Sequence, residues 1–165
     1  MKLYETNEIR NIALLGHIGS GKTTLSEAML VISGTKEKMG NTLNGTTSSD
    51  YHKEEKEKHF SIRLSPLTME YQGHKYNILD YPGYEDFKGD IYSSIDIIDG
   101  AVLVIDGSSG IELGTINSWK LLEDNNIPRI IFINKMNKGF INYKKLLEEL
   151  KEKFGCPVDL ELYVK

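Results

Sequence analysis

The chain has 165 residues, of which 39% are hydrophobic and 27% are charged, and its formal net charge is −4. This length is typical of one domain with a sizeable core, and the charge gives no electrostatic reason to expect non-specific nucleic-acid binding. The one cysteine, Cys156, excludes an internal disulfide bond and fits a reducing compartment. No apolar run approaches the roughly 18 residues that span a bilayer, and the first residues lack the apolar segment of a signal peptide. We therefore expect no membrane partner and a cytoplasmic location.

A glycine-rich motif follows an apolar run near the start of the chain. Residues 12–15, IALL, predict a buried strand, and residues 16–23 match G-x-x-x-x-G-K-T. A helical spacing of apolar side chains then begins, at Leu25, Ala28, Met29 and Ile32. This order indicates a P-loop, in which backbone N–H groups and the positive end of the helix surround phosphates. Lys22 would reach the β- and γ-phosphates, and the Thr23 hydroxyl would bind Mg²⁺. A glycine-rich turn that binds nothing is the alternative, and the flanking strand and helix argue against it.

A long polar stretch, residues 33–58, follows and shows no sustained apolar period. A loop of this length inside a compact domain is usually either functional or disordered. Residues 60–71 then alternate as a strand with one buried face and a candidate bulge at Pro66. The buried side chains of that face would be Phe60, Ile62 and Leu64. Residues 72–74 predict a hairpin turn into a second strand that ends at Asp80.

Helices and strands alternate after this hairpin. Residues 81–83, YPG, break the strand, and a helix is predicted through Ile91, Ile95 and Ile98. Residues 101–105 and 130–133 are continuous apolar runs, typical of strands covered on both faces. The helix between them has one apolar side, formed by Ile116, Trp119 and Leu122. The last helix has an apolar stripe, formed by Tyr143, Leu146, Leu147, Leu150 and Phe154.

This alternation predicts an α/β fold, the three-layer fold of P-loop nucleotide-binding proteins. We expect a mostly parallel sheet with helices on both faces and one antiparallel edge strand from the hairpin. In such sheets ligands bind at the carboxyl ends of the strands. The residues predicted to lie there are Gly16, Asp80, Asp106 and Asn134.

Two further motifs follow predicted strand ends. Residues 80–83 fit D-x-x-G, in which the carboxylate reaches Mg²⁺, commonly through water, and the glycine N–H approaches a γ-phosphate. This tetrapeptide is weak alone and gains weight from its position downstream of a P-loop. Residues 134–137, NKMN, are similar to the N-K-x-D sequence that recognises guanine. Adenine sites have no such signature, so Asn134 and Lys135 favour a guanine nucleotide over ATP. A P-loop ATPase or kinase is the more distant alternative.

With these motifs in place, the chain resembles the amino-terminal part of the GTPase domain of elongation factor G. That class of translational GTPases also includes ribosome-protection proteins. The resemblance covers nearly the whole length, through RNIALLGHIGSGKTTLSEAML, GTTSSDY, YNILDYPGYEDF, IDGAVLVIDGSSGIELGT and PRIIFINKMN. The chain is more similar to the atypical paralogues than to the main translocase. Gly19 and Ser20 stand where the translocase usually has Asp-Ala, and DYPGY stands where it has DTPGH.

The resemblance implies a site for GTP or GDP with Mg²⁺. The phosphates would be held by His17, Ile18, Gly19, Ser20, Gly21, Lys22, Thr23 and Thr24. The ligands of Mg²⁺ would be Thr23, Ser61 and Asp80. The residues that act in catalysis would be Lys22, Gly83 and Tyr84, with Asp80 and Gly83 facing the nucleotide. The residues that face the base would be Asn134, Lys135 and Asn137. Switch I would cover about residues 33–61 and switch II about residues 81–87, both ordered by the γ-phosphate and Mg²⁺.

Three residues depart from the family pattern. Tyr84 stands in place of a water-positioning histidine and cannot act as an imidazole near neutral pH, which predicts slow intrinsic hydrolysis. Alternatively, Tyr84 only packs, and the backbone or a partner orients the water. Asn137 replaces an aspartate that accepts two hydrogen bonds from guanine, so it should pair less well with guanine and could suit xanthine. Ser61 replaces a threonine and keeps the hydroxyl.

The family's last guanine-recognition loop lies beyond an inserted subdomain, and neither occurs in these residues. We therefore expect residues 1–165 to form a GTPase domain that is incomplete at its carboxyl end, with residues 155–165 starting the inserted subdomain. The expected function is Mg²⁺-dependent GTP hydrolysis with the ribosome as partner in translation, without sequence-specific nucleic-acid binding by this domain. The alternative is a nucleotide-dependent binding module with negligible hydrolysis.

Overall fold

The structure is a computed structural model that describes residues 3–42, 44–49, 63–83, 89–138 and 141–155. In this part of the chain, five strands form one sheet in the order β2-β3-β1-β4-β5. The strands are β1 (Ile9–Leu15), β2 (Ser65–Tyr71), β3 (His74–Asp80), β4 (Gly100–Asp106) and β5 (Arg129–Asn134). The helices are α1 (Lys22–Ile32), α3 (Gly89–Ser94), α4 (Leu113–Asp124) and α5 (Tyr143–Phe154), with 3-10 turns η1 (Thr6–Glu8) and η3 (Ile95–Ile97).

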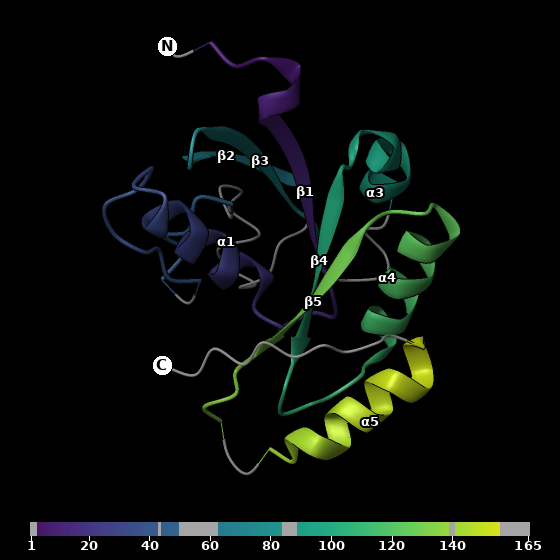
Figure 1. Ribbon diagram of the computed structural model, residues 1–165. Coiled ribbons are helices and arrows are strands. Elements are labelled where there is room, and N and C mark those ends of the chain that lie inside the picture. Colours follow the sequence, from purple (N-terminus) through teal and green to yellow (C-terminus); the bar gives the residue numbers. More distant parts are fainter. Residues whose placement is uncertain (1–2, 43, 50–62, 84–88, 139–140, 156–165) are drawn as a thin grey trace.

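The sheet has the predicted mixture of directions. Strand β1 pairs in parallel with β3 and β4, and β4 pairs in parallel with β5. Strand β2 pairs antiparallel with β3 at one edge. Figure 1 shows α1 on one side of the sheet and α3, α4 and α5 on the other. The three-layer α/β prediction is therefore confirmed.

Two apolar clusters fill the space between these layers. Alternate residues of a strand point to opposite faces, so Leu14 and Val104 pack in the cluster on the α1 side with Leu30. Leu103 and Ile105 pack in the other cluster, with side chains of α3, α4 and α5. Helices on both faces explain why the sequence of β4 is continuously apolar. The clusters leave the carboxyl ends of the parallel strands to polar residues.

The hairpin differs from its prediction in register and in its starting point. Strand β2 begins at Ser65, and its buried side chains are Ser65, Leu67 and Met69. Leu64, predicted to lie in the strand, precedes it and is half-buried against the cluster that contains α3. The candidate bulge is wrong, because Pro66 pairs with Leu79 in an unbroken register. An edge strand accepts proline without a bulge. Residues 60–62 lie outside the described residues.

Three helical predictions also need correction. Ile32, predicted on the buried side of α1, is 74% exposed, and Ser26 and Glu27 are fully buried instead. Ile116 is 38% exposed, whereas its predicted companions Trp119 and Leu122 are buried. Helix α3 stops at Ser94 because the Ser94 backbone leaves the helical region, and a separate 3-10 turn carries the chain toward β4.

Helix α5 follows its prediction. Leu146 and Leu150 are buried on its inner side, and the Asn142 side chain accepts a hydrogen bond from Lys145 N–H at its start. Among the described residues, no helix combines the length and the apolar character needed to cross a membrane.

Candidate nucleotide-binding site

Polar residues gather where the parallel strands end. Asp80 is the last residue of β3, Asp106 of β4 and Asn134 of β5, and Gly16 follows β1. Asp80 is in register with Leu14 of β1, and Asp106 is in register with Asn134. The sheet therefore brings the four predicted strand-end positions to the same edge.

The loop of residues 16–21 wraps around this edge and ends at the start of α1. The Ser20 N–H donates a hydrogen bond to the His17 carbonyl at 3.2 Å. Gly21 has a φ of 97°, which is strained for a residue with a side chain, and an added Cβ would lie 2.2 Å from Asn134 Nδ2. The glycine thus allows the loop and β5 to approach closely. The loop leads directly into the first N–H groups of α1, and the start of a helix is a favourable place for an anion.

Lys22 is almost completely buried beneath the same loop. Its Nζ donates to the Gly16 carbonyl at 3.1 Å and to the His17 carbonyl at 3.0 Å. Burial lowers the Lys22 pKa from 10.5 to about 8, although the nearby Asp80 carboxylate acts in the opposite direction. The ammonium is therefore held by weak neutral acceptors, and a polyphosphate would stabilise its charged form.

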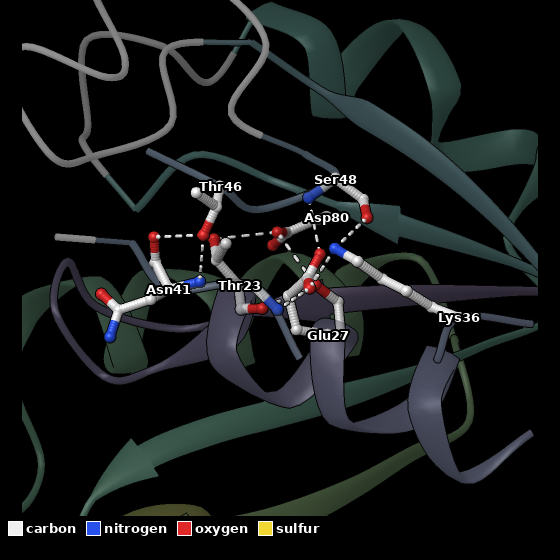
Figure 2. Close-up of polar contacts among 9 residues, drawn as sticks. Thr23, Glu27, Lys36, Asn41, Thr46, Ser48 and Asp80 are labelled. Atoms are coloured by element: carbon white, nitrogen blue, oxygen red, sulfur yellow. Dashed lines mark hydrogen bonds and ion pairs between the residues drawn. The ribbon is translucent and has the colours of Figure 1, made fainter. Parts of the chain in front are cut away.

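Thr23 and Asp80 place two oxygen groups beside the first turn of α1. Thr23 Oγ1 donates to Asp80 Oδ2 at 2.9 Å, and Asp80 is fully buried (Figure 2). Ser26 Oγ lies 3.5 Å from the same carboxylate oxygen. Hydroxyl and carboxylate oxygens are the ligands that Mg²⁺ prefers, so these two residues fit the predicted metal. The third predicted ligand, Ser61, lies outside the described residues.

Gly83, three residues after the end of β3, lies close to Ile18 and Lys22. A Cβ on Gly83 would lie 2.7 Å from Lys22 Nζ and 2.7 Å from Ile18 N. The absence of a side chain therefore lets the D-x-x-G backbone approach both the lysine and the loop amides. The residue before the motif's proline, Tyr81, is 2% exposed, and its hydroxyl lies 2.6 Å from Ser94 Oγ on α3. Tyr84 lies outside the described residues.

The predicted base-recognition residues are bonded to the phosphate loop. Asn134 Nδ2 donates to the Ser20 carbonyl at 2.9 Å, and Asn134 Oδ1 accepts from Lys135 N–H at 2.8 Å. Lys135 Nζ donates to the Gly19 carbonyl. Asn137 is exposed. The structure therefore joins Asn134 and Lys135 to residues 16–21 and leaves Asn137 at the surface.

Asp106 belongs to this arrangement, although only its strand-end position was predicted. Its Oδ2 accepts from Lys135 Nζ at 2.6 Å, and its Oδ1 accepts from Ser108 N–H at 2.9 Å. Burial alone would raise the Asp106 pKa, but the Lys135 ammonium and the Ser108 hydrogen bonds outweigh it and lower this pKa to about 2. Asp106 is therefore ionised at neutral pH and fixes the Lys135 side chain.

His17 contacts two parts of the molecule, one through its backbone and one through its side chain. Its backbone carbonyl contacts Lys22, but its ring faces the start of α4. The Gly114 N–H donates to His17 Nδ1 at 3.3 Å, and His17 Nε2 lies 3.4 Å from Glu112 Oε1. The side chain thus links the loop to α4, while the backbone remains part of the loop.

These features together define a P-loop nucleotide-binding domain. They are the loop that leads into α1, the Thr23 and Asp80 oxygens beside it, and the bonds from Asn134 and Lys135 to the loop. The chain belongs to the family described as the elongation factor Tu GTP-binding domain, whose family model matches residues 7–163.

Curated and solved relatives extend this finding. The chain is 38% identical over 161 residues to "Ribosome-releasing factor 2, mitochondrial" of Drosophila ananassae, covering 97% of this chain and 22% of the relative. It is 36% identical over 162 residues to "Elongation factor G" of Petrotoga mobilis, covering 98% of this chain and 23% of the relative. A crystal structure of a protein from Thermus thermophilus superposes with a TM-score of 0.87 at 39% identity, covering 95% of this chain and 24% of that one. The chain thus spans about a quarter of the length of these relatives.

Proposed function

We propose that this domain binds GTP and GDP with Mg²⁺ and hydrolyses GTP as part of an elongation factor G-like protein that acts on the ribosome in translation. The observation that carries the proposal is the bonding of Asn134 and Lys135 to the Ser20 and Gly19 carbonyls. These bonds put the residues typical of guanine recognition beside a phosphate loop. Membership of the GTP-binding family supports the same ligand.

Catalysis in this proposal rests on positioning and charge stabilisation. The amides of residues 17–24 and the Lys22 ammonium hold the phosphates. Thr23 and Asp80, with Ser61 as proposed third ligand, would hold Mg²⁺, which when bound would supply positive charge beside the phosphates. The Gly83 N–H contacts the γ-phosphate, where the attacking water approaches in line with the leaving oxygen. The products are GDP and inorganic phosphate.

The conformational output comes from two segments of the chain. Residues 33–61 act as switch I and residues 81–87 as switch II, because each adjoins a proposed contact to Mg²⁺ or to the γ-phosphate. The ribosome is the proposed partner, since the named relatives are a ribosome-releasing factor and an elongation factor. A cytoplasmic location is also proposed. One set of relatives carries the word mitochondrial in its name, so fractionation of cells is the direct check.

Nucleotide competition on the full-length protein tests the binding proposal. A fluorescent GDP analogue should be displaced by GTP and GDP and should remain bound in a hundredfold excess of ATP. Chelation of Mg²⁺ should speed its release. Equal displacement by ATP would sink the guanine assignment in favour of a P-loop ATPase or kinase.

A nucleotide-dependent binding module with negligible hydrolysis is the second candidate, and Tyr84 is the residue that favours it. A phenol cannot replace an imidazole as a proton acceptor near neutral pH. Single-turnover assays with and without ribosomes discriminate the two functions. The hydrolase proposal expects slow GTP cleavage alone, faster cleavage with ribosomes, and a faster intrinsic rate in Tyr84→His. Cleavage that stays undetectable with ribosomes favours the binding module.

A further inference from the structure

A fully buried carboxylate lies on α1, one helical turn beyond Thr23. Glu27 is 0% exposed, yet no apolar cluster contains it. Its Oε2 accepts from Gly40 N–H and from Lys36 Nζ, each at 2.6 Å, and its Oε1 accepts from Ser48 N–H at 2.5 Å (Figure 2). All three donors come from the loop that follows α1. The helix therefore binds that loop through one side chain.

Charge and hydrogen bonding both support an ionised Glu27. Burial by itself would raise the Glu27 pKa, but the hydrogen bonds from Lys36, Ser48 and Gly40 outweigh it and lower this pKa. A buried carboxylate that keeps its charge needs such partners. The contact is therefore built around the anion, and an uncharged side chain of the same size would not replace it.

The loop is shaped to fit this carboxylate. A Cβ on Gly40 would lie 2.7 Å from Glu27 Oε2, 2.5 Å from the Thr46 carbonyl oxygen and 2.7 Å from Thr47 Cα. Two of these neighbours are backbone atoms, which cannot move aside as a flexible side chain can. Gly40 thus permits the loop to close on itself around Glu27.

Further bonds hold the same loop together and attach its far end to the sheet. The Asn41 N–H donates to Thr46 Oγ1 at 2.9 Å, and the Thr46 N–H donates to the Asn41 carbonyl at 3.2 Å. Ser65 Oγ donates to the Ser49 carbonyl at 2.8 Å. Ser65 is the β2 residue in register with Asp80. The loop is thus attached to α1 through Lys36, Gly40 and Ser48, and Ser49 attaches it to β2 beside the proposed Mg²⁺ ligand.

We propose that Glu27 is a positioning residue that holds residues 36–42 and 44–49, the anchored segment, in one place in the nucleotide-free, GDP-bound and GTP-bound protein. Through this segment, Glu27 slows the release of the Mg²⁺–nucleotide. The effect on nucleotide release rests on the proposed function, whereas the fixed position of the anchored segment does not. It divides the proposed switch I, because the anchored segment keeps a fixed position and the conformational output of the switch then comes from the residues outside the anchored segment.

The contacts of Glu27 and Ser49 account for both the fixed position of the anchored segment and its effect on nucleotide release. None of the three donors to Glu27 belongs to a residue proposed to contact the nucleotide, so exchange of GDP for GTP leaves the contact intact. The segment ends at Ser49, which is attached next to the Thr23 and Asp80 oxygens. A segment held there limits the access of water to a metal bound by those oxygens. A segment released from α1 gives that access.

Glu27→Gln in the full-length protein tests the contact with almost no change in volume. The amide has one acceptor oxygen and turns an NH₂ group toward a backbone donor. The matched control is Glu37→Gln, which removes the same charge from an exposed position in the same loop. In wild type, the Gly40 and Ser48 amides should exchange with deuterium equally slowly in the nucleotide-free, GDP and GTP-analogue states. In Glu27→Gln they should exchange about tenfold faster or more, because one carboxamide oxygen cannot replace two carboxylate acceptors and the NH₂ group faces one of the two donors.

Nucleotide release supplies the second measurement. A fluorescent GDP analogue should leave Glu27→Gln about fivefold faster than wild type in Mg²⁺ and at the wild-type rate in EDTA, because a lost hydrogen bond is worth a factor of this size. Glu37→Gln should match wild type in both conditions. Acceleration of equal size in EDTA would show a general loosening of the domain and would overturn the positioning role.

Gly40→Ala reaches the same contact from the loop side and leaves α1 unchanged, so it decides the matter if Glu27→Gln fails to fold. It should reproduce the faster amide exchange and the Mg²⁺-dependent release. Two further results overturn the proposal: protection of the Gly40 and Ser48 amides that differs between GDP and GTP-analogue states, or wild-type exchange in the variants. If wild type binds no guanine nucleotide, the proposed function fails, and amide exchange alone still decides whether Glu27 fixes the segment.

Discussion

The proposed site has two parts that are held in place by different contacts. We call residues 16–24 with Asp80 and Gly83 the phosphate half, and Asn134, Lys135 and Asn137 the base half. In the phosphate half, Lys22 and Asp80 are buried and their partners are backbone carbonyls or neighbouring side chains. In the base half, Asn134 and Lys135 are half-buried and Asn137 is exposed. The base half reaches its position by bonding to the carbonyls of the phosphate loop. The phosphate half is therefore more buried than the base half, and the position of the base half depends on the phosphate loop.

This difference separates binding strength from base selectivity. The phosphate loop contains the buried Gly16 and Ser20 and leads into the buried Lys22, so we expect it to reorganise little when a polyphosphate binds and to contribute most of the affinity. Side chains that are half-buried or exposed can change with smaller effects on the fold, and we propose that those of the base half determine which base is accepted. Substitutions in the phosphate half should thus abolish binding of every nucleotide. Substitutions in the base half should change the ratio between nucleotides.

Lys22→Met should have the largest effect. It removes the ammonium proposed to contact two phosphates while filling the same buried space, and two charge-assisted contacts correspond to a loss of roughly 100-fold or more in affinity. Equilibrium titration with GDP, GTP and XTP should show equal losses. Lys120→Met on the exposed side of α4 is the control and should bind normally. A selective loss for one base would contradict the division into two halves.

Asn137→Asp should have the next largest effect, and in the opposite direction. The restored carboxylate accepts from both guanine N–H groups, which is worth about 1.5–3 kcal/mol, or about 10- to 100-fold tighter GTP binding. XTP binding should weaken, because the xanthine oxygen would face a carboxylate. Asn126→Asp adds the same charge at an exposed position before β5 and should change neither affinity. An unchanged ratio of GTP to XTP affinity would show that other contacts select the base.

The sequence was sufficient to predict where the residues of the proposed phosphate half lie in the fold, because most of them are consecutive and their placement follows from local spacing. A strand, a glycine-rich loop and a helix start define where Gly21, Lys22 and Thr23 must lie. The mostly parallel sheet with one antiparallel edge strand also followed from the alternation of elements. The contact of Asp106 with Lys135 and the contacts of Glu27 with the loop after α1 could not be predicted, because each depends on how the fold places a segment outside the local motif. The only local signal for Glu27 was a charge one turn after Thr23, on a helix whose apolar period did not include it.

The hairpin shows a second reason for failure. Leu64 and Leu67 are three residues apart, so in one continuous strand their side chains would point to opposite faces. Alternation alone therefore did not establish which face of the strand is buried against α1. The structure places the start at Ser65, because Leu64 packs against the other apolar cluster before pairing with β3 begins. Similarly, Ile32 and Ile116 fit helical periods but lie at positions that no neighbouring layer covers.

Asp106→Asn should have a smaller effect, confined to the base half. It removes the charge that fixes Lys135 Nζ and leaves a partly buried ammonium with weaker partners. We expect a several-fold loss of GDP affinity and about 1–2 kcal/mol lower free energy of unfolding. Denaturant titration and GDP binding measure the two quantities. Inorganic pyrophosphate, which uses only the phosphate half, should bind as in wild type, and weaker pyrophosphate binding would show that Asp106 also shapes the loop.

The smallest expected effect is a change in proton uptake, and it tests the burial of Lys22. With a pKa of about 8 in the nucleotide-free protein, Lys22 is mostly charged at pH 7 and mostly neutral at pH 8.5. Phosphates favour the charged form, so GDP binding should take up about 0.1 proton at pH 7 and about three quarters of a proton at pH 8.5. Calorimetry in two buffers of different ionisation enthalpy measures this uptake.

The same shift has a defined sign for stability. The folded-state pKa of Lys22 is below its ordinary value of 10.5, so between about pH 8 and 10.5 the unfolded chain binds a proton that the folded protein lacks. Lys22 therefore destabilises the nucleotide-free fold below pH 8, and this cost disappears as the pH rises toward 10.5. In Lys22→Met that contribution should be absent, and the unfolding free energies of the two proteins should converge at high pH. No proton uptake at pH 8.5 in wild type would mean that Lys22 is solvated, and the phosphate half would then be no more buried than the base half.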